Sequence, residues 1–290
     1  MGLIDRVRVC QRRDLARYPR FVVGDTAVGW VRPDFVDRLR GFPDTFIVTD
    51  GTVRLDPRLA DFDSRSQAVE AVLLRLEEEG LVPGWRNEPY PVGTDFHAPP
   101  LLKMERAAVP GFGVRAYGVH INGHVEARPG SNDGLGIWVG KRSRSKPTAP
   151  GKLDHLVAGG QPLGLGLMDN LVKECAEEAA IPGPLARTAR PAGFVSYVME
   201  NEEGVRNDVL FVYDLAVPAD FVPRNTDGEI EEFYLWPVAR VIETLASGDA
   251  FKFNVALVVI DFLVRRGLLP PEDADYLEIV HGLRLGTAIP

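Results

Sequence analysis

Residues 157–182 read VAGGQPLGLGLMDNLVKECAEEAAIP, a short strand-like segment that ends in two glycines and leads into a helical pattern. Glu174, Glu177 and Glu178 lie at i, i+3 and i+4, so their side chains share one arc of the predicted helix. Beside that arc, apolar residues recur at spacings of three and four, which is typical of a buried helix face: Met168, Leu171, Val172, Cys175 and Ala179. The pattern therefore predicts a helix with three acids at the edge of a core.

Three neighbouring acids favour a divalent cation beside this helix. Like charges four residues apart repel each other by about 0.2–0.5 kcal/mol. A hard cation reverses that repulsion, because Mg²⁺ and also Mn²⁺ bind carboxylate oxygens and keep positions open for substrate phosphates. A solvated helix face with ordinary acids is the alternative, since glutamate is a common helix former.

The order of residues in this segment resembles the signature of the Nudix hydrolases. That signature runs glycine, five residues, Glu, seven residues, Arg-Glu, two residues, Glu-Glu, one residue, Gly and an apolar residue. Gly159 stands at its first position, Glu174 follows the place of the arginine, and Glu177 and Glu178 form the acidic pair. The resemblance implies that these three glutamates are Mg²⁺ ligands. It also implies that Glu177 or Glu178 takes a proton from the attacking water.

Three positions depart from the signature. Leu165 replaces its first Glu, Lys173 replaces its Arg, and Ala180 replaces its Gly. In the family the first two usually support each other as an ion pair, so their replacements are linked. We expect Lys173 to pair with Asp169 at i−4 instead. Because the ligand carboxylates remain, we expect the chemistry to be kept.

A narrower resemblance extends over nearly the whole chain. Residues 20–39, 142–160, 169–182 and 251–267 are similar to the Nudix subgroup related to thiamine pyrophosphokinase. This resemblance implies hydrolysis of thiamine diphosphate, or of its oxidised oxy and oxo analogues, to the monophosphate and phosphate. One alternative is a Nudix pyrophosphatase acting on ADP-ribose, a nucleotide sugar or another nucleoside diphosphate derivative. The other is a Nudix-fold protein that only senses a metabolite, which the complete acidic triad disfavours.

Basic residues gather just before the two glycines. Arginine offers a planar fork to phosphate oxygens and lysine offers a point charge. We therefore predict that the substrate diphosphate is bound near Gly159 and Gly160 by some of these cations; an edge strand kept soluble by its charge is the alternative. The cations are Lys141, Arg142, Arg144, Lys146 and Lys152.

The segment TDGEIEEFYLWP, residues 226–237, holds the candidates for a general base. It lies where many Nudix proteins keep a further ligand or base, and a carboxylate near a metal-bound water can accept its proton. Glu229 is the first choice and Glu231 the second. A plain surface acid is the alternative for both.

Three residues near the C-terminus are candidates for contact with the rest of the substrate. Trp236 and Phe253 have ring faces that suit stacking on a heterocycle, although simple packing is the alternative. Asn254 caps the final helix on a structural interpretation, and the resemblance leaves a substrate contact open.

The length and the pattern predict an α+β protein of two domains. Residues 1–105 are expected to form a small α+β domain, with a linker over 84–102. Residues 106–290 are expected to form an α/β/α sandwich around a mixed sheet, the fold that the resemblance implies. The chain has 290 residues, enough for two modest cores.

The net charge and the cysteine content limit the kinds of partner and the cellular compartment that we expect. A net charge of −8 argues against a general nucleic-acid binder, which needs a basic surface. No apolar run reaches membrane-spanning length, and the two cysteines favour a reducing cytoplasm. We expect a small-molecule diphosphate as the partner, with a homodimer as an open option.

Overall fold

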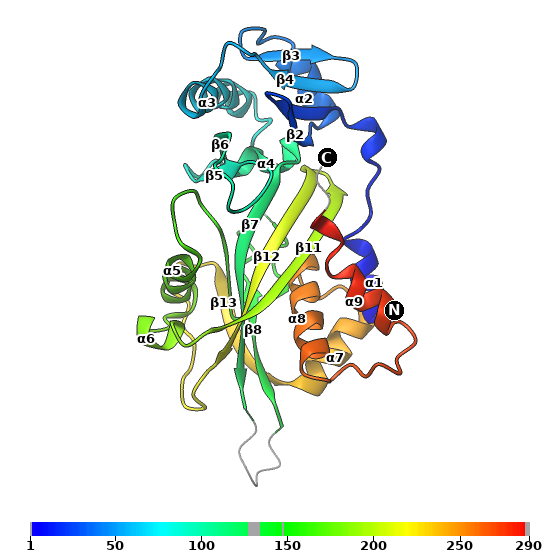
Figure 1. The fold of residues 1–290 in the computed structure, drawn as a ribbon. Coiled ribbons are helices and arrows are strands. Elements are labelled where there is room, and N and C mark those ends of the chain that lie inside the picture. The colour runs from blue at the N-terminus through cyan, green and yellow to red at the C-terminus, as the bar shows by residue number, and fades with distance from the viewer. Residues whose placement is uncertain (1, 127–133, 147, 288–290) are drawn as a thin grey trace.

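In the computed structural model, residues 2–126, 134–146 and 148–287 are described, and they form two units stacked end to end (Figure 1). The first part of the chain forms α1 (Leu3–Val9), η1 (Leu15–Arg17), β1 (Arg20–Val23), β2 (Thr26–Trp30), α2 (Pro33–Leu39), β3 (Phe46–Thr49), β4 (Thr52–Leu55), α3 (Phe62–Glu78), β5 (Pro89–Val92), β6 (Leu102–Glu105), η2 (Arg106–Ala108) and α4 (Val109–Phe112). The remainder forms β7 (Arg115–Val125), β8 (Gly136–Arg142), β9 (Leu153–Asp154), β10 (Val157–Gly160), α5 (Leu167–Ala179), α6 (Gly183–Ala186), β11 (Arg190–Asn201), β12 (Gly204–Ala216), β13 (Ile230–Pro237), α7 (Val238–Ser247), α8 (Phe253–Arg265), α9 (Tyr276–Gly282) and η3 (Leu285–Thr287).

The first unit is a four-stranded sheet in the order β2-β1-β4-β3, with α3 beside it. Its two hairpins turn at Gly24 and Gly51, where the positive φ angles of 59° and 76° suit glycine. Asp61 caps α3 by accepting a hydrogen bond from the Ser64 N–H at 2.8 Å. The turn residues Gly24-Asp25 and Asp50-Gly51 predict these two hairpins, and the apolar spacing within residues 64–83 predicts the helix; the structure confirms all three elements.

The predicted linker over 84–102 is wrong, because part of it is a strand that pairs with the strand after it. β5 and β6 form an antiparallel hairpin in which Tyr90 lies opposite Met104 and Val92 lies opposite Leu102. All four side chains are buried in the core of the first unit. The prolines that suggested a linker occupy the alternate positions of β5, and an edge strand tolerates their missing N–H groups.

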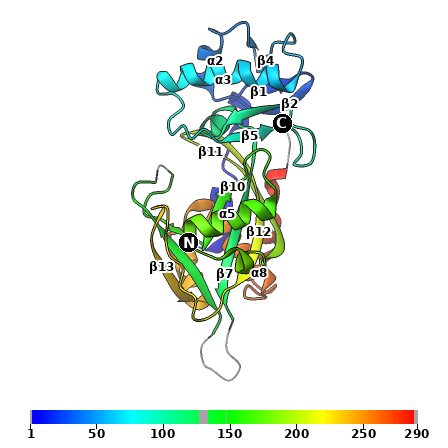
Figure 2. The ribbon, with the colours of Figure 1, turned by 90° about the vertical axis from the view of Figure 1, so that its left-hand side faces the viewer.

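The second unit is the predicted α/β/α sandwich. Its seven-stranded sheet follows the order β11-β12-β7-β8-β13, with β10 paired to β7 and β9 paired to β8. β7 and β12 run parallel while the other pairs are antiparallel, so the sheet is mixed. Helices α5 and α6 cover one face, and α7 and α8 cover the other (Figures 1 and 2).

β7 contradicts one local prediction. The pair Asn122-Gly123 within residues 113–127 predicts a hairpin turn, yet β7 continues through both residues to Val125. A Cβ atom on Gly123 would lie 2.1 Å from Cδ2 of Leu156, so the glycine makes room for a packed leucine. The missing side chain therefore serves a close approach in the core and does not mark a turn.

The two cores take residues from both sides of residue 105. Ile4 and Val7 of α1 pack with α8 and α9 in the core of the second unit. Phe112 and Val114, which follow residue 105, belong to the core of the first unit. The division into 1–105 and 106–290 stays a prediction, and these contacts show that each unit needs the other part of the chain.

Candidate active site

The two glycines of β10 leave space for one side chain on each side of the strand. A Cβ atom on Gly159 would lie 2.2 Å from Cδ of Glu174. A Cβ atom on Gly160 would lie 1.5 Å from the hydroxyl oxygen of Tyr90. Distances below 3 Å do not occur between such atoms, so any side chain here would displace the acid of α5 or the tyrosine of β5. Because neither glycine has a side chain, α5 and the β5–β6 hairpin can both approach β10 closely.

Helix α5 presents its predicted apolar face to the sheet. Leu171, Cys175 and Ala179 are fully buried between α5 and the strands. The helix ends at Ala179, and the next residue, Ala180, has a left-handed φ of 53°. The signature has glycine at this position, which suits a left-handed φ. Alanine is strained there, because a Cβ atom disfavours the left-handed region.

The three glutamates of α5 are held in different ways. Glu178 is buried and accepts a hydrogen bond from the Ala158 N–H of β10 at 2.9 Å. Glu174 and the more exposed Glu177 both bind the ammonium of Lys173, at 3.0 and 2.8 Å.

The expected pairing of Lys173 with Asp169 is therefore wrong. Lys173 instead forms ion pairs with Glu174 and Glu177, which follow it in α5. Asp169 instead accepts a hydrogen bond from Arg187 at 3.2 Å, just beyond α6.

A second segment brings further acids to Glu178. Carboxylate oxygens of Glu178, Asp227 and Glu229 lie within 4.8 Å of one another, and no other such group of three occurs in the described part of the chain. Glu229, the first choice for the base, thus lies in this carboxylate cluster. Glu231 does not, because it pairs with Lys141 at 2.9 Å. Asp227 was not predicted, although it stands only two residues before Glu229 in the same turn.

The electrostatics of the carboxylate cluster suit a divalent cation. Burial raises the pKa of Glu178 well above its ordinary value, and the charges of Asp154, Glu174 and Glu229 raise it further. Burial also raises the pKa of Glu174. A nearby positive charge would favour the ionised forms. Because carboxylate oxygens are the ligands that Mg²⁺ and Mn²⁺ prefer, the residues present fit such an ion.

Most of the predicted phosphate-binding cations are already paired with acids of the protein. The Arg144 side chain is exposed, and its backbone N–H donates to Glu231. The buried guanidinium of Arg142 lies 2.6 Å from its partner, which suits a structural pair. The ion pairs are Lys141 with Glu231, Arg142 with Asp154, Lys146 with Glu229, and Lys152 with Asp249.

The structure places Trp236, Phe253 and Asn254 away from the face of the sheet that α5 covers. Trp236 and Phe253 pack in the core between the sheet and α7 and α8. Arg240 covers the ring of Trp236 at 3.9 Å from its centroid. Asn254 is not the helix cap, because α8 begins one residue earlier and Lys252 holds the cap position. The stacking and contact roles of all three stay predictions without support from their positions.

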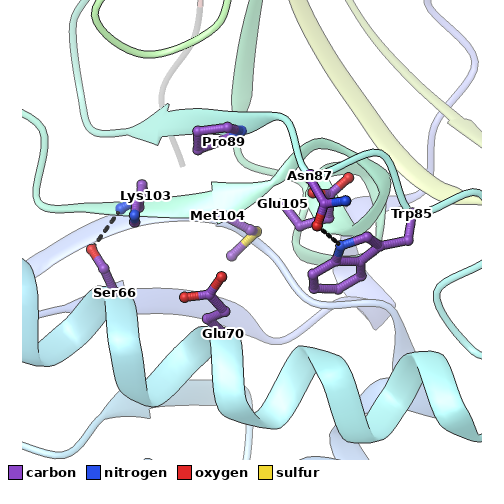
Figure 3. Close-up of a pocket in the computed structure, with 8 residues that line it drawn as sticks. All are labelled: Ser66, Glu70, Trp85, Asn87, Pro89, Lys103, Met104 and Glu105. Atoms are coloured by element: carbon purple, nitrogen blue, oxygen red, sulfur yellow. Dashed lines mark hydrogen bonds between the residues drawn. The ribbon is translucent and has the colours of Figure 1, made fainter.

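A cavity of about 180 Å³ lies elsewhere, between α3 and the β5–β6 hairpin (Figure 3). Trp85 and Asn87 line it and are joined by a hydrogen bond of 2.9 Å. Its other lining residues are Ser66, Glu70, Pro89, Lys103, Met104 and Glu105. It includes none of the residues predicted to act on the substrate.

Comparison with known proteins agrees with this arrangement. The mixed sheet between two helical layers is the α/β/α fold that the resemblance to the Nudix hydrolases implies. Nudix hydrolase 20, chloroplastic, of Arabidopsis thaliana is 44% identical over 295 residues, which cover 98% of this chain and 78% of that protein. The chain therefore belongs to the Nudix hydrolase family and is an enzyme of that family.

Two further relatives cover most of the chain. Nudix hydrolase 24, chloroplastic, of the same plant is 44% identical over 289 residues, covering 98% of this chain and 78% of that protein. An uncharacterized protein of Saccharomyces cerevisiae is 33% identical over 255 residues, covering 82% of this chain and 73% of its own. Residues 2–116 match a family described as a domain of unknown function, DUF4743. Among the described helices, none combines the length and apolarity that crossing a membrane requires.

Proposed function

We propose that this enzyme hydrolyses a small organic diphosphate, with thiamine diphosphate or its oxidised analogues as the preferred substrates, and that Mg²⁺ assists the reaction. The observation that carries the proposal is the carboxylate cluster of Glu178, Asp227 and Glu229 beside the glycines of β10. Nudix hydrolases generally use divalent ions, usually Mg²⁺. The substrate class rests on the resemblance of four segments to the subgroup related to thiamine pyrophosphokinase.

The roles of the residues follow from their positions. Glu178 and Glu229, with Asp227, would hold the cation, and Glu174 stands beside them at Gly159. When bound, the cation polarises phosphoryl oxygens and makes a water molecule more acidic. Burial alone would raise the pKa of Glu229, but its ion pair with Lys146 holds that pKa below the ordinary value, so the ionised carboxylate is available to accept a proton. The Ala158 N–H orients Glu178 toward the cluster.

Two other assignments are part of the proposal. A cytoplasmic location is consistent with two free, buried cysteines; the two plant relatives, in contrast, are chloroplastic by name. A homodimer remains a prediction that sedimentation can test.

Hydrolysis by wild type and Glu178→Gln tests the function. The substrates are thiamine diphosphate, its oxy and oxo analogues, ADP-ribose and a nucleotide sugar, each with Mg²⁺. We expect release of phosphate from the thiamine compounds and a loss of about 10² or more in kcat for Glu178→Gln.

Glu77→Gln is the matched control, because Glu77 is an exposed acid of α3 in the other unit. Its rate should equal that of wild type. Preferred turnover of ADP-ribose would move the substrate to the pyrophosphatase class, and full activity of Glu178→Gln would remove Glu178 from the site.

A further inference from the structure

Phe96 brings an aromatic ring from the β5–β6 hairpin onto the sheet of the second unit. It lies in the loop of residues 93–101, between β5 and β6. Its ring centroid is 5.0 Å from that of Tyr117 in β7 and 4.8 Å from that of Phe211 in β12, with interplanar angles of 63° and 61°. The rings of Tyr117 and Phe211 are stacked at 6.1 Å and 17°. These three residues form an aromatic cluster, to which the first unit gives one ring and the sheet gives two.

Hydrogen bonds hold the loop that carries Phe96. The guanidinium of Arg115, at the start of β7, donates to the Thr94 carbonyl oxygen at 3.3 Å. The His97 N–H donates to the Asp95 carboxylate at 2.9 Å, and the His97 ring packs edge-on against Phe96 with the centroids 5.0 Å apart. The ring of Phe96 is therefore in place before a ligand binds, which lowers the cost of ordering the loop on binding.

The aromatic cluster lies on the same face of the sheet as Glu174. Phe211 of β12 is the register partner of Val119 in β7, and Val119 is the partner of Gly159 in β10. Side chains at partner positions point to the same face of a sheet. A Cβ atom on Gly159 would point at Glu174, so Phe211 and Glu174 share that face.

This row of partner residues ends beside the carboxylate cluster. The residue before Gly159 is Ala158, whose N–H donates to Glu178 of that cluster at 2.9 Å. Two strand spacings separate β12 from β10, which is about 10 Å. A diphosphate joined to a ring by a short chain can therefore extend from the carboxylates across β7 to the aromatic cluster.

Phe211 is only half-buried, although it lies in the middle of a central strand. β12 lies between β11 and β7, and the neighbours of Phe211 on the same face, Val209 and Tyr213, are 9% and 7% exposed. Phe96, which packs on Phe211, is half-buried as well. The cluster thus keeps ring surface that a ligand can still bury, and aromatic rings gain from burial and from contact with another ring.

We propose that the aromatic cluster binds a flat heteroaromatic ring of the diphosphate substrate, through contacts with Phe96 and Phe211. This inference rests on the proposed function and deepens it, because it assigns the residues that recognise the organic group. Aromatic faces attract other rings and also cations. The cluster therefore favours a heteroaromatic diphosphate, including one with a positively charged ring, over a bare diphosphate.

Ligand binding without divalent metal separates the ring from the phosphates. Calorimetry compares thiamine diphosphate and ADP, which carry different rings, with inorganic pyrophosphate, which carries none. Phe96→Leu and Phe211→Leu should each raise the Kd of a ring ligand at least about fivefold, the scale of stacking on an aromatic side chain, and leave that of pyrophosphate unchanged. Phe42→Leu is the matched control, because Phe42 is a partly buried phenylalanine in the core of the first unit.

Hydrogen exchange on wild type requires no variant to fold. Thiamine diphosphate should slow amide exchange within residues 93–101, and pyrophosphate should not. Unaltered affinity of both folded variants for thiamine diphosphate and ADP, or a loop that neither ring ligand protects, would overturn the inference. Ring-dependent binding of thiamine diphosphate without its hydrolysis would refute only the proposed function.

Discussion

Gly159→Ala tests whether β10 is shaped around the carboxylate of Glu174. The new methyl group would lie 2.2 Å from Cδ and 2.3 Å from Cγ of Glu174, whereas carbon atoms in contact are about 3.5–4.0 Å apart. The end of the glutamate must therefore move by more than about 1 Å. An off-rotamer side chain costs about 0.5–1.5 kcal/mol, so we expect a loss of stability in that range.

The functional loss from Gly159→Ala should exceed the structural loss. A decrease of about 1 kcal/mol lowers Tm by about 2–4 °C in a protein of roughly this size. Displacing a carboxylate from a metal site should weaken Mn²⁺ binding by about 10–100-fold, which is the scale seen when supporting residues of metal sites are changed. Thermal unfolding and Mn²⁺ titration measure the two effects separately.

A double-mutant cycle isolates the contact. With Glu174→Ala as the background, Gly159→Ala meets no carboxylate and should cost close to nothing, which gives a coupling energy of about 1 kcal/mol. Gly248→Ala is the control, since a Cβ atom there has no atom within 4 Å. The same destabilisation in both backgrounds, or full Mn²⁺ affinity in Gly159→Ala, would refute the role assigned to this glycine.

Two further predictions concern stability. Ala180→Gly should raise the free energy of unfolding by about 1 kcal/mol, because glycine carries no penalty at a φ of 53°; chemical denaturation measures this, and an unchanged midpoint would mean that the turn relaxes. Burial lowers the pKa of His155 to about 4, so the unfolded chain binds this proton more tightly. The free energy of unfolding should fall as the pH drops from about 6.5 toward 4, by up to about 3 kcal/mol, and the fall should be shallower in His155→Gln.

Local patterns predicted much of the fold. The hairpins at Gly24 and Gly51 and the buried face of α5 followed from turn residues and periodicity. Some glycines and prolines were wrongly predicted to mark a turn or a linker, because their role depends on contacts with residues distant in the sequence. Gly123 makes space for Leu156, and the prolines of β5 occupy an edge strand, and neither reason is visible without the partner residues.

The site was predicted less completely than the fold. The signature predicted Glu174, Glu177 and Glu178 as ligands because their spacing on one helix is a local property, and of these three only Glu178 lies in the carboxylate cluster. Asp227 comes from the segment before β13, which only the folded chain brings near Glu178. Most of the cations before β10 pair with acids such as Asp154 and Asp249, and the sequence pattern of the basic segment does not reveal these partners.

The backbone passes between the two units twice, once after α1 and once from α4 into β7. At the second crossing the φ of Gly113 is 55°, and a Cβ atom there would lie 2.7 Å from the Trp30 carbonyl oxygen. Because the chain connects the two units twice and the second connection is tightly packed, we expect little hinge motion of one unit relative to the other. Ligand entry would then depend on changes of side-chain rotamers, and both units should unfold in a single calorimetric transition.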